Sequence, residues 1–183
     1  MEVLVIVDVQ NDFIDGALRN EEAIKRIPNI IEEINNFKGK YIFLTRDTHD
    51  KNYMNTMEGS RLPVEHCIKG TEGWQIKKEV MDAVLKKQKE NKCKVKIINK
   101  KSFGYDKWSK VLKKLVKKYG PTLDFKIFGY CTGICVDNQA SGIKAAAPES
   151  HISIVERCCA CVTPESHKNA LEAMKMWHID IIE

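Results

Sequence analysis

The chain of 183 residues is 43% hydrophobic and 30% charged, with a formal net charge of +5. This length predicts a single domain over residues 1–183, and the composition excludes a chain that is mainly disordered. The small basic excess excludes the dense positive surface of a nucleic-acid-binding or membrane-surface protein, so we expect neither kind of partner.

The N-terminal segment MEVLVIVD reaches Asp8 with no basic stretch before it, which is not the pattern of a signal peptide. No apolar run approaches the length of about 18 residues that a membrane-spanning helix needs. We therefore expect a soluble, cytoplasmic protein whose seven cysteines are reduced. The cluster of Cys158, Cys159 and Cys161 is interpreted as buried structural thiols.

Short β-branched runs alternate with amphipathic stretches along the chain, the pattern of repeated strand–helix units. Several runs are continuously apolar, as parallel strands covered on both faces are. The predicted strands are residues 3–7, 41–44, 95–98, 125–129, 152–155 and 179–182. The predicted fold class is α/β: a three-layer αβα sandwich around a six-stranded, mostly parallel sheet.

Amphipathic helices are predicted between these strands. The first carries isoleucines at helical spacing over residues 24–34, with Pro28 marking an early turn or kink. The next two extend over residues 76–84 and 108–115, and a fourth begins near Gly133. The last opens at Thr163-Pro164, a capping residue followed by a proline at the first helical position.

Residues 46–73 break this alternation. They contain no periodic apolar pattern and are longer than the usual connection between a strand and a helix. Because long insertions in compact domains are usually functional, we expect this segment to contribute to a site.

Polar or reactive residues follow four of the predicted strands. Asp8 follows the first, Asp47 and His49 the second, Lys100 the third, and Cys135 lies soon after the fourth. Taken singly, they have ordinary interpretations as a turn cap, a surface lysine or a buried cysteine. Ligands of an open parallel sheet bind at the carboxyl ends of its strands, however, so together these residues indicate a site where nucleophile, base and cation converge.

Asp8, Lys100 and Cys135 suit the hydrolysis of an amide. Cys135 is expected near the start of a helix, where free N–H groups and the ammonium of Lys100 favour a thiolate at neutral pH. A carboxylate paired with the lysine can move a proton from the thiol to the leaving group. The turn over residues 130–133 can supply backbone donors to the oxyanion.

A metal site is a second possibility, formed by Asp47, His49, Glu58 and His66. Asp47 and His49 leave a strand two residues apart, so both side chains can point to one side. Carboxylates and imidazoles suit one divalent ion, with Zn²⁺ the first choice and Fe²⁺ or Mn²⁺ as alternatives. An isolated Asp-x-His pair is also common, and an exposed loop histidine is the alternative interpretation of His66.

The motifs VDVQNDF, TRDTHD, LPVEHCIKGTEGW, NKKSFG and GYCTGICVDNQA, in this order, resemble those of the isochorismatase-like cysteine hydrolases, especially the nicotinamidase branch. The resemblance extends over essentially the whole chain. It implies a catalytic triad of Asp8, Lys100 and Cys135. It also implies an oxyanion hole formed by the backbone N–H groups of Cys131 and Cys135, with a cis peptide bond between Tyr130 and Cys131.

The nicotinamidase branch hydrolyses nicotinamide to nicotinate and ammonia through a cysteine thioester, a step of NAD salvage. The resemblance places its metal set on Asp47, His49 and His66 and, as in some members, on Glu58, with the metal accepting the pyridine nitrogen. Phe13 corresponds to an aromatic residue that lines the ring pocket. The implied partner is a small amide substrate, and we expect a homo-oligomer.

Two features depart from the family pattern. Gly133 stands where the family usually has Asp, which removes a carboxylate from the helix start and loosens the turn. The second pocket aromatic has no definite counterpart, and Tyr105 and Trp74 are the candidates.

Other functions stay open at this point. One is a related cysteine hydrolase of the same superfamily: an isochorismatase, a ureido-acid hydrolase or an amidase for another heteroaryl amide. Another is a catalytically silent interaction domain. Nucleotide binding is disfavoured, because DVQNDFIDG lacks the glycines of a phosphate-binding loop.

Overall fold

The structure is a computed structural model that describes residues 1–183. Its strands are β1 (Glu2–Val7), β2 (Tyr41–Asp47), β3 (Lys94–Lys100), β4 (Asp124–Gly129), β5 (His151–Val155) and β6 (Asp180–Ile182). Its α-helices are α1 (Asn11–Ile14), α2 (Glu21–Asn36), α3 (Met57–Arg61), α4 (Lys78–Asn91), α5 (Trp108–Tyr119), α6 (Asp137–Ala146) and α7 (Pro164–Lys175). Three further turns are η1 (Tyr53–Asn55), η2 (Thr132–Val136) and η3 (Glu156–Cys158).

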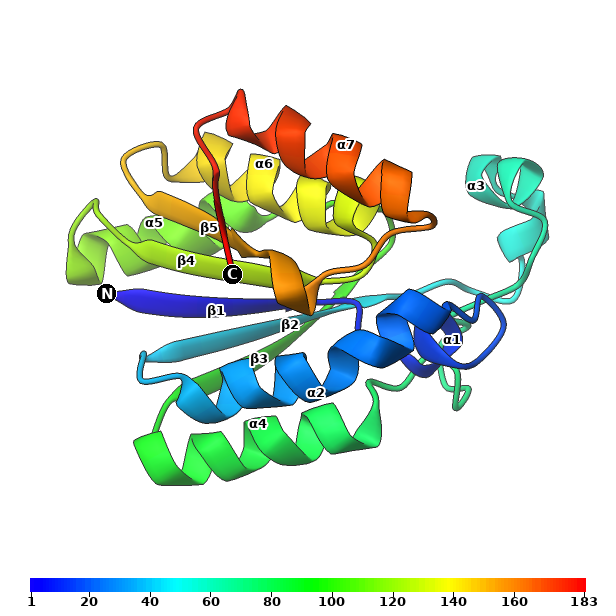
Figure 1. The fold of residues 1–183 in the computed structure, drawn as a ribbon, viewed down its shortest axis with the longest axis horizontal. Helices are drawn as coiled ribbons and strands as arrows, with labels where there is room; N and C mark the ends of the chain where they lie inside the picture. Colours follow the sequence, from blue (N-terminus) through cyan, green and yellow to red (C-terminus); the bar gives the residue numbers. More distant parts are fainter.

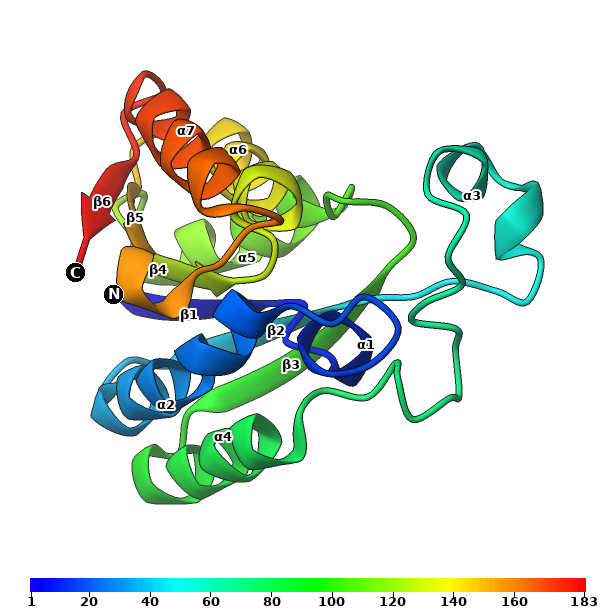
Figure 2. The ribbon, with the colours of Figure 1, turned by 45° about the vertical axis from the view of Figure 1, so that its right-hand side comes forward.

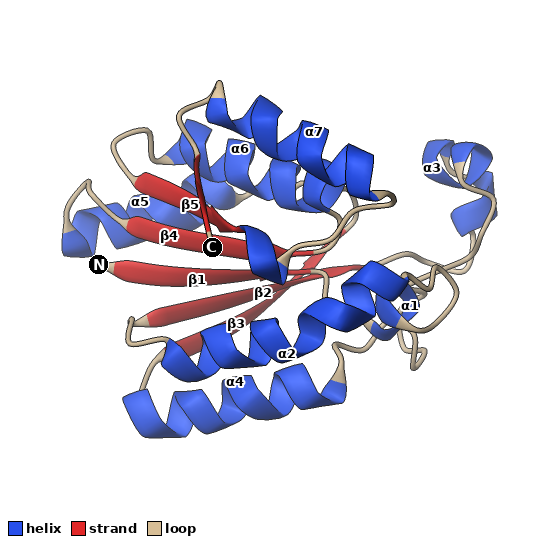
Figure 3. Ribbon diagram, in the orientation of Figure 1, coloured by secondary structure: helices blue, strands red, loops and turns tan.

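The strands form one sheet in the order β3-β2-β1-β4-β5-β6, and every neighbouring pair is parallel. Helices α2 and α4 cover one face, and α5, α6 and α7 cover the other (Figures 1 and 3). The predicted three-layer sandwich is therefore confirmed, with a sheet that is wholly rather than mostly parallel. A parallel sheet of this kind gathers the carboxyl ends of its strands on one side.

The centre of the core is β1, whose residues from Val3 to Val7 are at most 1% exposed. Burying each such side chain stabilises the fold by roughly 1.5–3 kcal/mol. The predicted strands all form, but β2 and β3 extend further, to Asp47 and Lys100. The added residues are polar: Thr45, Asp47 and Lys100 face the site, whereas Arg46 and Asn99 bond each other at the surface, so none of them matched the apolar pattern of a buried strand.

The helices begin close to the predicted positions, but α4 continues to Asn91, well beyond the predicted range of residues 76–84. Asn20 caps α2 by accepting the N–H of Ala23 at 2.9 Å, and the helix continues past Pro28 to Asn36. Thr163 caps α7 in a capping box with Ser166, as the Thr-Pro start predicted. The helix predicted near Gly133 begins as the π-type turn η2 and continues as α6. No helix combines the length and the apolar character that crossing a membrane requires.

Residues 48–73, which we call the arm, extend beyond the carboxyl ends of the strands and hold α3 away from the sandwich (Figure 2). The arm is not a featureless loop. Tyr53 is fully buried, and its hydroxyl donates to the carbonyl of Leu62 at 2.9 Å. Thr56 caps α3 by accepting the N–H of Gly59. These contacts fix the side chains of the arm that face the sheet.

Candidate active site

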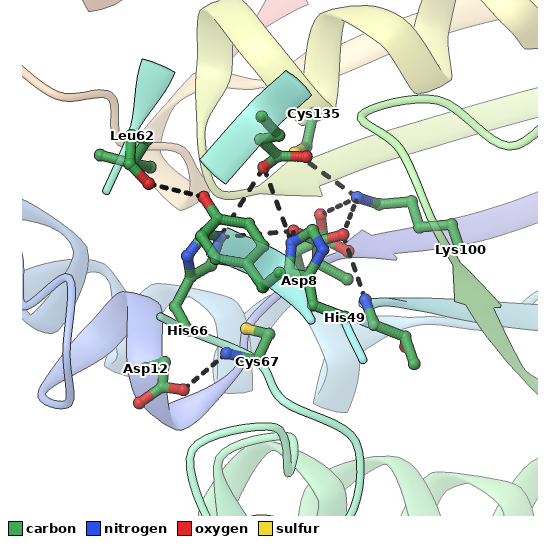
Figure 4. A network of polar contacts seen from close by, with 12 residues as sticks. Asp8, Asp12, His49, Leu62, His66, Cys67, Lys100 and Cys135 are labelled. Carbon is green, nitrogen blue, oxygen red and sulfur yellow. Dashed lines mark hydrogen bonds and ion pairs between the residues drawn. The ribbon is translucent and has the colours of Figure 1, made fainter. Parts of the chain in front are cut away.

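Asp8, Lys100 and Cys135 meet at the carboxyl edge of the sheet, each from a different strand (Figure 4). Asp8 follows β1, Lys100 is the last residue of β3, and Cys135 lies in η2 after β4. The ammonium of Lys100 lies 2.7 Å from Asp8 Oδ2 and 3.6 Å from Cys135 Sγ. All three side chains are buried, so the contacts act in a medium where charges interact strongly.

Thr45 is a fourth residue of this cluster, which was not predicted from the sequence. Its hydroxyl donates to Asp8 Oδ1 at 2.6 Å, while the backbone N–H of Asp8 donates to the Thr45 carbonyl at 3.2 Å. Asp8 is thus held on one oxygen by Thr45 and on the other by Lys100. A hydroxyl that interrupts the apolar run YIFL at the end of a strand was the available signal.

Charge and burial set the protonation of this cluster. Burial opposes the charge of Lys100, but its interactions with Asp8, with the sulfur of Cys135 and with Asp47 outweigh burial and raise the pKa of the lysine. Burial raises the pKa of Asp8, and Asp47 adds to this, although Lys100 acts in the opposite direction.

The expectation of a resting thiolate at Cys135 was wrong. Burial first, and then the negative charge of Asp8, raise the pKa of Cys135 well above that of a free thiol, and Lys100 offsets only part of this. Cys135 therefore rests as a thiol. Its proton has to leave as the sulfur forms a bond, and Asp8 is the neighbouring base.

A cavity of about 540 Å³ opens onto Cys135. Phe13 and Tyr130 line it with ring centroids 5.6 Å apart, and Phe103 lines it as well. Trp74 and Tyr105 do not line it: the Trp74 ring lies under the guanidinium of Arg46, and Tyr105 packs on Trp108. The aromatic partner of Phe13 is instead Tyr130, which was not among the predicted candidates.

The turn between β4 and η2 has the expected cis peptide bond, between Tyr130 and Cys131. The N–H of Cys131 donates to no acceptor of the protein, and Cys131 lines the same cavity as Cys135. This leaves the Cys131 donor available to an oxyanion. A Cβ added to Gly133 would lie 3.0 Å from the Cβ of Ala170 in α7, so the aspartate usual at this position would press on that helix.

Asp47, His49, Glu58 and His66 form a cluster in which one ligand atom of each lies within 4.8 Å of all the others. Asp47 ends β2, and the arm supplies His49, Glu58 and His66. Asp47 Oδ2 lies 3.0 Å from Nε2 of His49 and 3.7 Å from Nε2 of His66. Glu58 Oε1 lies 3.6 Å and 3.9 Å from the same two nitrogens.

This donor set fits a divalent ion. His66 uses Nδ1 to hydrogen-bond the carbonyl of Val64 at 2.8 Å, which turns Nε2 towards the carboxylates. Burial alone would raise the pKa of Asp47, but the hydrogen bonds from His49 and His66 outweigh it and lower the pKa, so the carboxylate is charged. His66 is buried in the structure rather than exposed in its loop. Two imidazoles and two carboxylates are ligands that zinc, iron and manganese accept.

Gln10 and Asp12 hold the segments that carry these ligands, and neither role was predicted from the sequence. Gln10 accepts the N–H of Asp47 at 2.7 Å and donates to the carbonyls of Asp47 and Trp74, both at 2.9 Å. Asp12 accepts the N–H of Cys67, next to His66, at 2.7 Å (Figure 4). Both lie in the motif VDVQNDF, where polar residues next to a buried strand were the signal.

A parallel three-layer sandwich whose carboxyl edge presents a buried cysteine beside an aspartate and a lysine is the arrangement of a cysteine hydrolase. The isochorismatase domain family matches residues 2–182. Because this match extends over nearly the whole chain, the protein belongs to that family.

Individual relatives share the fold at low identity. The nicotinamidase of Saccharomyces cerevisiae is 29% identical over 130 residues, which are 55% of this chain and 56% of the yeast protein. A nicotinamidase/pyrazinamidase of Bacillus subtilis superposes with a TM-score of 0.83 at 26% identity, covering 100% of this chain and 99% of that one. A pyrazinamidase of Pyrococcus horikoshii, solved in complex with zinc, gives a TM-score of 0.77 at 26% identity and covers 100% and 98%.

Proposed function

We propose that the protein is a nicotinamidase, which hydrolyses nicotinamide to nicotinate and ammonia. The observation that carries this proposal is the position of the metal-ligand cluster, since Asp47, Glu58 and His66 line the same cavity as Cys135. A site that binds the ring nitrogen at one end and attacks the carboxamide at the other fits a pyridine carboxamide. The names of the Bacillus, Pyrococcus and yeast relatives support the same activity.

In the first half of the proposed reaction, Cys135 Sγ attacks the carboxamide carbon and its proton passes to Asp8. Lys100 holds Asp8 at 2.7 Å and stabilises the negative charge that develops on the sulfur. The backbone N–H groups of Cys131 and Cys135 receive the oxyanion. Asp8 then gives its proton to the nitrogen, the C–N bond breaks, and ammonia leaves a thioester on Cys135.

In the second half, water attacks the thioester carbon while Asp8 takes up a proton from it. The C–S bond breaks, nicotinate is released, and Cys135 regains its proton. Thr45 and Lys100 keep Asp8 in place through both halves, because each holds one of its two oxygens.

The cofactor that we propose is one divalent ion on Asp47, His49, Glu58 and His66, with zinc the first choice and iron or manganese as alternatives. When bound, it supplies a Lewis acid that accepts the pyridine nitrogen and so orients the ring. The Phe13 ring packs near both a candidate metal ligand and the second aromatic residue of the cavity. Its centroid lies 5.4 Å from that of His66 and 5.6 Å from that of Tyr130. We propose that Phe13 and Tyr130 enclose the pyridine ring.

The proposal is tested by comparing the turnover of nicotinamide with that of benzamide, which has the same carboxamide but lacks the ring nitrogen. We expect nicotinamide to be cleaved much faster, and a chelator to reduce this preference. Equal cleavage of both amides, unchanged by chelation, would contradict the role of the ring nitrogen and favour another hydrolase of the superfamily.

A cytoplasmic location and a homo-oligomeric state also belong to the proposal. Seven free cysteines are usual in a reducing compartment. Fractionation of cells and light scattering of the purified protein test these two predictions separately.

A further inference from the structure

Cys131 and Cys161 are buried thiols brought together from two different connections of the sheet. Cys131 follows β4, and Cys161 lies between η3 and α7. The two segments run in parallel, because Tyr130 pairs with Ala160 and the N–H of Thr132 donates to the Ala160 carbonyl at 2.8 Å. This backbone pairing places the two cysteines side by side, with their Sγ atoms 2.6 Å apart and both thiols free.

The surroundings of Cys161 favour its thiolate. The hydrogen bond from Cys131 acts first, and the hydroxyl of Ser166 and the N–H groups of Gly133 and Val162 add to it, so the pKa of Cys161 falls to about 5 although burial opposes this. The same contact, together with burial, raises the pKa of Cys131. One member of the pair is therefore a nucleophile, and the other is a thiol in contact with it.

The remaining cysteines lack this activation. Burial raises the pKa of Cys67 and Cys93, and it raises the pKa of Cys158 and Cys159 to about 12. Cys135 is also held as a thiol. Cys161 differs from these cysteines in geometry as well, because a second sulfur lies against it and it lines a small cavity, so reaction with an electrophilic oxidant is expected there.

Cys161 is buried, but a small cavity separate from that of Cys135 lies beside it. Cys161 lines this cavity of about 50 Å³ between α2 and α7, together with Arg26, Thr163 and His167. Cys131 instead lines the large cavity that contains Cys135. A small cavity of this size holds a molecule not much larger than water, which takes about 30 Å³ of liquid volume.

We propose that Cys131 and Cys161 form an oxidisable dithiol site, which hydrogen peroxide converts to an intramolecular disulfide. The Cys161 sulfur attacks one oxygen of the peroxide and the O–O bond breaks, which leaves a sulfenic acid and a hydroxide that takes up a proton to give water. The sulfur of Cys131 then loses its proton, attacks the sulfenic sulfur and releases hydroxide, which combines with that proton. The two sulfurs are oxidised by two electrons in total, and the peroxide is reduced.

The site shares Cys131 with the proposed oxyanion hole, but its oxidation involves the side-chain sulfur rather than the backbone N–H and does not depend on which amide is cleaved. It would covalently join the turn that leads to Cys135 with the connection that leads to α7. A thiol reductant reverses it by exchange.

The test is peptide mapping of the whole protein after treatment with hydrogen peroxide near neutral pH and alkylation of the remaining thiols. Trypsin separates the pair into peptides 127–144 and 158–168, because Lys144 and Arg157 lie between the two cysteines. We expect these peptides to be linked, with loss of two of the seven free thiols and recovery after reduction. Fragmentation should place the bond on Cys161 rather than on Cys158 or Cys159.

Matched variants identify which cysteines form the disulfide. Cys135→Ser leaves Cys131 as the one cysteine of its peptide and should keep the link, whereas Cys161→Ser should abolish it. Cys93→Ser, a buried cysteine away from the pair, should behave as the unmodified protein. Oxidation confined to Cys135, or a link that forms equally on Cys158 and Cys159, would overturn the proposal. The mapping needs no substrate, so its result is independent of the nicotinamide assay.

Discussion

Cys135 is surrounded by groups that delay its ionisation until a substrate is attacked. We expect Cys135→Ala to lower the rate of ammonia release from nicotinamide by at least about a thousandfold, because the covalent route disappears. Cys93→Ala is the control: it removes a buried sulfur at the start of β3 and should leave the rate unchanged. Substantial activity in Cys135→Ala would remove the thioester from the mechanism.

Thr45 acts on the reaction through Asp8. The variant Thr45→Val keeps the shape of the side chain and loses the hydroxyl that donates to Asp8 Oδ1 at 2.6 Å. We expect kcat to fall by about 10–100-fold with little change in KM, since positioning of the base is lost.

The pH profile separates this positioning role from a general loss of stability. The hydrogen bond from Thr45 lowers the pKa of Asp8, so removing it should shift the acidic limb of the profile to higher pH. Thr122→Val, an exposed threonine at the far end of the sheet, should change neither kcat nor the profile. An unchanged acidic limb in Thr45→Val would argue against the role of Thr45.

At the level of the elements, His151 connects three neighbouring strands at the amino end of the sheet. Its two ring nitrogens pair with Asp124 at the start of β4 and Asp180 at the start of β6. These hydrogen bonds, Asp124 first, raise the pKa of His151 above its ordinary value of 6.5. The group is largely exposed, so its contribution to stability is small and sensitive to salt.

The stabilisation that His151 contributes decreases as the pH rises. Because the pKa is raised in the folded state, the stabilisation is fully present below the unfolded value of 6.5 and is lost as the pH rises through the folded value. We expect the Tm advantage of the unmodified protein over His151→Gln to be larger at a pH of about 6 than at about 8.5. Thermal melts at low salt measure it, and an advantage that grows with pH would contradict the assignment.

The helices and strands that are long and apolar were the ones best predicted from the sequence. All the strands of the sheet and the long helices follow from hydrophobic runs and spacing, whereas α1, η1 and α3 were not predicted because they are short and lack a periodic apolar face. The ends of β2 and β3 were placed too early, since Asp47 and Lys100 belong both to a strand and to the site.

The reactive residues of the site could be predicted from their positions after the strands, but their protonation states could not. The ionisation of Cys135 depends on how deeply the whole cluster is buried, which is a property of tertiary packing. Thr45 and Gln10 act on other residues of the site through hydrogen bonds from a different strand or turn. No local pattern shows such partners before the segments are brought together.

At the scale of the whole molecule, a bound metal ion should stabilise the folded protein. The four candidate ligands meet only in the fold, because β2 and the arm supply them from separate positions. An ion present at about 100 times its Kd adds about 2.7 kcal/mol, which corresponds to a Tm increase of roughly 5–10 °C for a domain of this size.

Calorimetry with added zinc, and after chelation, measures this shift. His66→Ala should abolish most of it, while the control His178→Ala, which replaces a histidine outside the cluster, should keep it. The same zinc-induced increase in both variants would place the ion elsewhere.

The arm has a consequence for how such an enzyme diversifies. The bond-breaking residues Asp8, Lys100 and Cys135 are anchored on the sheet, but Glu58 and His66 lie on a segment that projects from it. The arm thus contributes one part of the cavity wall, while Phe13 and Tyr130, which lie outside the arm, contribute the aromatic part. Directed evolution of residues 48–73 should therefore alter the candidate metal site, and with it the range of amides accepted, while Asp8, Lys100 and Cys135 stay in place on the sheet.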